Sequence, residues 1–180
     1  MKNALVFVVS LISVAVGLSA SGQDHAKLIA EAVLPLPESL RDGAAVVWEN
    51  EPGKRTVLRE GTNDLLCKAD PPSPGFVAEC YHKSLDPLYT RLSAVFAEGR
   101  GADAAKILDE EVRAGKLTVE SGRTTYLLSG AVLVAALPIM TVTLPGATAE
   151  STGLPTEQDN YRPWLMWSGT AVAHVMIPGK

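Results

Sequence analysis

The apolar side chains in the first third of the chain change from a helical repeat to an alternating one. Residues 25–33 carry them at helical spacing, and Pro35 and Pro37 end the repeat, which predicts a short helix. Two β-prone runs follow at 44–48 and 56–59. The turn-forming residues between these runs predict a β-hairpin.

The middle of the chain carries the clearest helical pattern. Asp86 and Pro87 form a favourable N-cap and first-turn pair, and the apolar residues that follow share one helix face. A second helix is predicted over 103–114, with Gly115 placed to end it in the left-handed conformation. The acidic residues 109–111 would diverge around this helix, so we interpret them as a solvated face rather than a metal site.

The last third of the chain is predicted to be mostly β-structure. Runs at 123–129 and 139–144 have strand character, and those at 164–167 and 171–177 flank a short turn, which predicts a terminal hairpin. The order of the elements favours one small α+β domain over residues 24–180. We expect a mainly antiparallel sheet with two to three helices.

Length and composition agree with a single domain. The chain has 180 residues, of which 47% are hydrophobic and 20% charged, so it can bury one self-sufficient core. The net charge is -4 and there are no basic runs. This charge pattern offers no surface for nucleic acid, which we do not expect as a partner.

Residues 1–20 have the features of a secretory signal peptide. Lys2 precedes an apolar segment, residues 4–18, and small residues follow it, so we expect cleavage after Ala20 or Gly22. The apolar segment is shorter than the roughly 20 residues that span a bilayer. We therefore expect an exported chain, periplasmic or secreted, with no membrane span in its mature form.

Both cysteines, Cys67 and Cys80, lie in the mature part of the chain. In an exported protein two thiols at this spacing most often form a disulfide, and we expect one here. Three prolines and a glycine lie between them, so residues 68–79 are expected to form an irregular loop rather than a helix or a central strand. A catalytic thiol near His82 is the alternative.

Several short segments of the mature chain form a pattern: Val57–Asn63, then Cys67, a proline-rich loop and Cys80, and later Gly115-Lys116, Thr125–Ser129 and Ala173–Ile177. The pattern resembles a group of uncharacterised bacterial exported proteins. This resemblance implies bacterial export and supports the domain boundaries. The group has no established activity, so the resemblance implies none for this chain.

Candidate catalytic residues are few. The sequence lacks the common motifs of serine hydrolases, zinc proteases, thiol–disulfide oxidoreductases and phosphate-binding loops. His82 and Asp86 are spaced for an acid–base pair, and with Asn63 they allow a hydrolase of unfamiliar arrangement. A histidine that bonds to the backbone near the disulfide is the simpler interpretation.

One histidine lies in a strand that also carries methionine. His174 shares a strand face with Met176, and is either partly buried and hydrogen-bonded or one wall of a pocket. Together with Met140 and Met166 these side chains would suit a soft metal such as Cu(I). Because methionine more often fills a core, we expect no metal and no other cofactor.

Large aromatic residues complete the candidates for binding, since Trp48, Trp164 and Trp167 can stack on a sugar or a peptide. We expect a small exported binding or interaction protein without catalysis, whose partner is a small ligand or a protein of the cell envelope or exterior. Besides the hydrolase, a structural envelope component is the other alternative. The candidate binding residues are Trp48, Asn63, His82, Trp164, Trp167 and His174.

Overall fold

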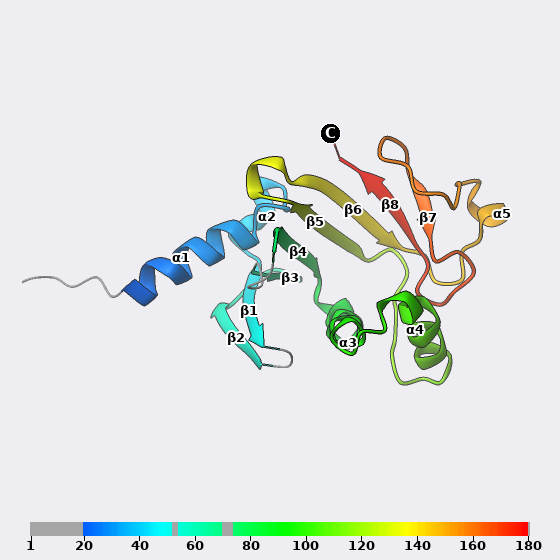
Figure 1. Cartoon of the computed structure of the whole chain (residues 1–180), viewed down its shortest axis with the longest axis horizontal. Helices are drawn as coiled ribbons and strands as arrows, with labels where there is room; N and C mark the ends of the chain where they lie inside the picture. The colour runs from blue at the N-terminus through cyan, green and yellow to red at the C-terminus, as the bar shows by residue number, and fades with distance from the viewer. Residues whose placement is uncertain (1–19, 52–53, 70–73, 180) are drawn as a thin grey trace, which may run out of the picture.

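An eight-stranded sheet runs through the molecule, with helices against it (Figure 1). The computed structural model describes residues 20–51, 54–69 and 74–179. In this part of the chain the strand order is β2-β1-β3-β4-β5-β6-β8-β7, and every pairing is antiparallel except that of β1 with β3. The predicted α+β fold with a mainly antiparallel sheet is confirmed.

Among the described residues, three α-helices are longer than seven residues and two are single turns. The helices are α1 (Ala20–Ala32), α2 (Glu38–Arg41), α3 (Asp86–Ala97), α4 (Ala104–Arg113) and α5 (Ala149–Thr152). The strands are β1 (Ala45–Glu51), β2 (Lys54–Arg59), β3 (Leu65–Lys68), β4 (Phe76–His82), β5 (Thr124–Gly130), β6 (Leu137–Thr143), β7 (Trp164–Met166) and β8 (His174–Pro178). Short 3₁₀ turns are η1 (Lys83–Leu85), η2 (Gly101–Asp103) and η3 (Leu133–Ala135).

Both predicted hairpins and both middle helices are confirmed. β1 pairs with β2 and β7 pairs with β8, each antiparallel. α3 and α4 occupy the two helical repeats, and Gly115 follows α4 with a φ of 71°. The cap of α3 differs from the prediction: Leu85 takes the N-cap position, because the carboxylate of Asp86 bonds to Arg55 and Tyr81.

The prediction that residues 68–79 contain no central strand is wrong for its second half. The prolines of this segment lie before Phe76, so they leave the strand-forming residues 76–82 free to pair. β4 pairs with β3 on one side and β5 on the other. Alternation within β4 buries Phe76, Ala78 and Cys80 and leaves Val77 exposed.

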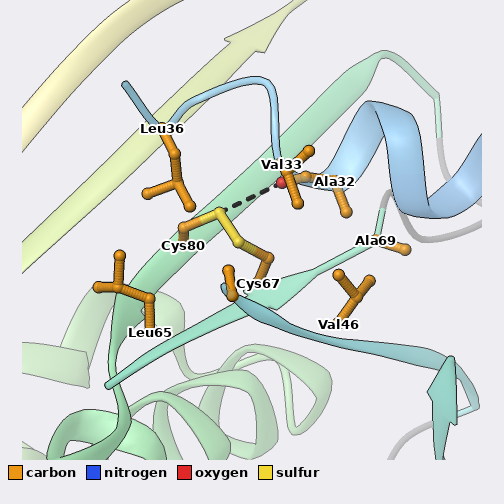
Figure 2. Packing of buried hydrophobic residues seen from close by; sticks show 9 residues of the cluster. Ala32, Val33, Leu36, Val46, Leu65, Cys67, Ala69 and Cys80 are labelled. Carbon is orange, nitrogen blue, oxygen red and sulfur yellow. Dashed lines mark hydrogen bonds between the residues drawn. A yellow bond between two sulfur atoms is a disulfide. The ribbon is translucent and has the colours of Figure 1, made fainter. Parts of the chain in front are cut away.

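One face of the sheet packs against α1 through the predicted disulfide, which is confirmed (Figure 2). Cys67 and Cys80 are directly opposite each other in β3 and β4, and both are fully buried. The carbonyl oxygen of Ala32, at the end of α1, lies 3.2 Å from Cys80 Sγ. The disulfide therefore joins two central strands next to the end of α1, among Ala32, Val33, Leu36, Val46, Leu65 and Ala69.

The other face packs against α3 and α4. Tyr81, next to Cys80 in β4, points to this face because neighbouring strand residues alternate. Its ring stacks on that of Tyr89 in α3, with centroids 4.3 Å apart. Tyr81, Leu85, Leu88, Leu108 and Val172 form the buried centre of this layer.

The predicted signal peptide lies almost wholly outside the described residues, which begin at α1. Only Ala20–Gly22, the expected cleavage region, belongs to the described chain, as the first turn of that helix. In the described ranges, no helix has both the length and the apolar character that a bilayer crossing requires.

Candidate functional site

The sheet carries a small groove at the end away from α3 and α4. In Figure 1 these two helices lie below the sheet, while the β5–β6 turn, the end of β8 and the loop before β7 form its upper edge. The groove encloses about 70 Å³. Its lining consists of Leu137, Pro138, Ile139, Gln158, Asp159, Asn160, Trp164, Met176, Pro178 and Gly179.

Strand register gathers the apolar part of this lining. Ile139 pairs with Pro178, and Trp164 pairs with Met176, so these four side chains share one face of β6, β8 and β7. Neighbouring strands lie about 4.8 Å apart, which places the four within contact reach of one ligand. The polar part comes from the loop before β7 and forms one rim of the groove.

The loop that forms the polar rim is held by Asp159. Its carboxylate accepts hydrogen bonds from the backbone N–H groups of Tyr161 and Arg162, and from Arg162 Nε at 2.7 Å. The Tyr161 N–H and the Arg162 side chain lower the pKa of Asp159. Its charge is therefore used to shape the loop, and Gln158 and Asn160 remain as uncharged polar groups of the rim.

The outer edge of β7 is partly closed. Leu165 N–H donates to the carbonyl oxygen of Pro155 at 2.8 Å, so the loop before β7 covers the centre of this edge strand. A ligand in the groove would therefore meet side chains rather than add a strand to the sheet.

The three tryptophans do not share one surface. Trp164 lines the groove. Trp48 packs against the cluster around the disulfide, and Trp167 packs under α3 and α4. Of the three tryptophans, Trp164 is therefore the one that lines this groove.

His174 lies beside Trp167 rather than in the groove. The two rings meet edge to face at 5.2 Å, and His174 Nδ1 donates to the carbonyl oxygen of Val172 at 2.9 Å. Burial lowers the pKa of His174, which favours the neutral ring. This placement matches the buried, hydrogen-bonded alternative of the two that the sequence left open.

The methionines considered for a soft metal are divided between the two faces of the sheet. Met176 pairs with Thr141, the residue next to Met140 in β6. Neighbouring residues of a strand point to opposite faces, so Met140 and Met176 lie on different faces of the sheet. In the described part of the chain, no group of three or more His, Cys, Asp or Glu side chains is arranged to hold a metal ion.

His82, Asp86 and Asn63 are engaged in separate interactions. His82 Nδ1 accepts from Ser84 N–H, and its Nε2 lies 3.3 Å from Arg123 Nη1. Asn63 donates to the carbonyl oxygen of Leu40 and accepts from Leu65 N–H, which ties two loops together. The structure does not bring these three side chains into one catalytic arrangement.

Asp86 is the centre of a polar network between β2, β4 and α3. Arg55 Nη1 donates to both of its carboxylate oxygens, at 2.8 and 2.9 Å, and Tyr81 Oη donates at 2.8 Å. Burial opposes ionisation, but these hydrogen bonds outweigh it and lower the pKa of Asp86. The network fixes the start of α3 against the sheet.

Glu79 is a polar residue that the sequence analysis missed. It lies on the α3 face of β4, opposite Lys68 in β3, and Lys68 Nζ donates to Ser93 Oγ of α3 at 3.1 Å. Burial raises the pKa of Glu79 to about 7, against the attraction of Lys68. No motif marks Glu79, and its burial could be recognised only if residues 76–82 had been assigned to a strand.

Comparisons with family models, curated proteins and solved structures found no match to this chain. The support for a function therefore comes from the geometry of the groove.

Proposed function

We propose that this protein is a small exported binding protein, and that the groove at the upper end of β6, β8 and β7 takes the apolar part of its ligand. The observation that supports this is the pairing of Trp164 with Met176 in an open cavity. Both side chains are only half-buried, so each keeps apolar surface for a ligand. An aromatic ring beside a flexible thioether adapts to ligands of varied shape.

The polar rim defines what the ligand carries at its other end. Gln158 and Asn160 each offer a donor and an acceptor without charge. We therefore propose a ligand with an apolar chain or ring and an uncharged or weakly charged polar group. The site has a binding role in this proposal, and no side chain in its lining is assigned to catalysis.

Export is part of the proposal. The Cys67–Cys80 disulfide supports it, because such bonds persist in oxidising compartments. The apolar segment at residues 4–18, preceded by Lys2, supports it independently.

Calorimetric titration with decanol and decanoate tests the groove. Both probes carry an alkyl chain, and they differ in the charge at the polar end. We expect decanol to bind and the negatively charged decanoate to bind more weakly, and Met176→Ala to weaken the binding of decanol by about tenfold, the effect of losing one apolar contact. Met140→Ala is the matched control, since Met140 is equally half-buried but lies on the other face of the sheet. Binding of neither probe, or equal loss in both variants, would contradict the proposal.

A further inference from the structure

The turn between β5 and β6 is made entirely of apolar residues and projects from the upper edge of the sheet (Figure 1). It comprises residues 131–136, and Leu137, the first residue of β6, continues the apolar run. Val132, Val134 and Leu137 are 54%, 96% and 66% exposed, and Val134 is the most exposed large apolar residue of the described chain. A soluble surface seldom carries such side chains side by side without a partner.

The uncharged stretch extends well beyond the turn. Residues 124–149 contain no Asp, Glu, Lys, Arg or His, although a fifth of the whole chain is charged. Charged residues are the usual means of keeping a projecting hairpin in water. β5 and β6 lie inside the sheet and are partly buried, so their lack of charge needs no partner. The lack of charge is informative in the turn, where Val132 and Val134 are exposed.

The turn also bonds its own backbone. Ala135 N–H donates to the carbonyl oxygen of Val132 at 3.0 Å, and Ala136 N–H donates to that of Leu133 at 3.1 Å. Gly130 allows this tight geometry, because a Cβ atom there would lie 2.7 Å from Ala136 Cα. These two internal hydrogen bonds lower the cost of removing the turn from water.

The turn and the groove form one apolar surface, here called the upper rim. Leu137 follows the turn and lines the groove, and the loop before β7 adds Tyr161, which comes directly after the lining residue Asn160 and is 93% exposed. Tyr161 and Trp164 are the residue types that gather at the headgroup level of membranes. The nearby charges of Asp159 and Arg162 pair with each other at 2.7 Å.

We infer that the upper rim docks on the surface of a phospholipid bilayer, with residues 131–137 inserted among the headgroups and the groove facing the lipid. The inference rests on the proposed function, because it identifies the apolar ligand of the groove as lipid. The turn is convex and uncharged, which fits a deformable lipid surface, and it is too short to cross one. Residues 4–18, an apolar segment directly before α1, would bring the chain to a membrane during export.

Flotation with phosphatidylcholine vesicles tests this docking. The oxidised, exported protein should float with the vesicles, equally at low and high salt, because phosphatidylcholine carries no net charge and the expected contacts are apolar. Val132→Asp should reduce the bound fraction about tenfold or more, since an ionised side chain is strongly disfavoured in the interface. Val57→Asp is the matched control: Val57 is also 54% exposed, but it lies on the edge strand β2. Circular dichroism of both variants checks that the fold is retained.

The outcomes separate this inference from the proposed function. Vesicle binding that survives Val132→Asp, or that vanishes equally with Val57→Asp, would overturn the docking inference, whatever decanol does in the groove. Absence of vesicle binding with decanol still bound would overturn it and leave the groove as a small-ligand site. Self-association that Val132→Asp abolishes, without vesicle binding, would show instead that the rim joins two copies of the chain. Vesicle binding lost only with Val132→Asp, while decanol and decanoate fail to bind, supports docking and contradicts the small-ligand role.

Discussion

Replacement of Glu79 by glutamine is expected to stabilise the protein above neutral pH and to leave its stability nearly unchanged at about pH 4. Burial raises the pKa of Glu79 from 4.5 to about 7. Between these two values the folded protein holds a proton that the unfolded chain has released. The share of stability that Glu79 contributes is therefore complete below about pH 4.5 and is lost as the pH rises to about 7.

The magnitude follows from the pKa of Glu79. A tenfold change in proton affinity corresponds to about 1.4 kcal/mol, so ionisation of Glu79 destabilises the fold by about 3 kcal/mol. Part of the side chain still meets solvent, which makes this value an upper bound. Glutamine has the shape of the protonated acid and carries no charge, so E79Q should recover most of this energy at about pH 8.

Urea unfolding of the wild type and E79Q, followed by circular dichroism across this pH range, measures the effect. The comparison must be between variants, because buried His174 has a lowered pKa and its share of stability changes with pH in the opposite direction. Glu60→Gln is the control, since Glu60 is exposed. If E79Q is as stable as the wild type at about pH 8, or less stable, then the ionised Glu79 is well satisfied by Lys68 and the reasoning is refuted.

Three further variants test the packing. Cys67→Ser/Cys80→Ser should lose about 2–4 kcal/mol of unfolding free energy in denaturant titration, and a change near zero would contradict a stabilising disulfide. Asp86→Asn should lower the free energy of unfolding by about 1–3 kcal/mol at neutral pH, and by less at a pH acid enough to protonate Asp86. The sign follows because the pKa of Asp86 is lowered, so its contribution is lost as the pH falls; an equal cost at both pH values would contradict this. Gly61→Ala should lower the free energy of unfolding by about 3 kcal/mol, because its Cβ atom would lie 2.3 Å from Ala45 N. Thermal unfolding measures this loss, and an unchanged melting temperature would show that the backbone at residue 61 can move away from Ala45.

Local patterns predicted the elements whose stability is local. α3 and α4 were found from a helical repeat, and the hairpins from β-prone runs flanking a turn. The parallel pairing of β1 with β3 joins strands that are not consecutive, and no local pattern specifies it. β4 does not follow from the sequence because Pro71, Pro72 and Pro74 argue against a strand in the whole segment 68–79, whereas proline restricts only its own neighbourhood.

The candidate site could be predicted only in part, because the sequence does not specify which strand residues lie opposite each other. The sequence identified Trp164 as a binding residue but grouped it with Trp48 and Trp167, and only the strand pairings reveal that these side chains occupy different places. Asn63 is a candidate binding residue in the sequence, but both polar atoms of its side-chain amide connect two loops in the structure, and the sequence gives no sign of this. The same limit hid Glu79, whose raised pKa depends on a strand and a helix that enclose it.

The position of the exposed apolar residues favours a functional interpretation of the upper rim. A sheet with free edges is prone to pair with other sheets, and both edges of this one carry protection. β2 bears Lys54, Arg55 and Arg59, and the centre of β7 is covered by Pro155. The uncharged strands β5 and β6 lie inside the sheet, between β4 and β8, where neighbours satisfy their backbone. Val57, Val77 and Phe96 are exposed singly on other elements, whereas Val132, Val134 and Leu137 are exposed within one short segment, and such a grouping favours an interaction surface over chance exposure.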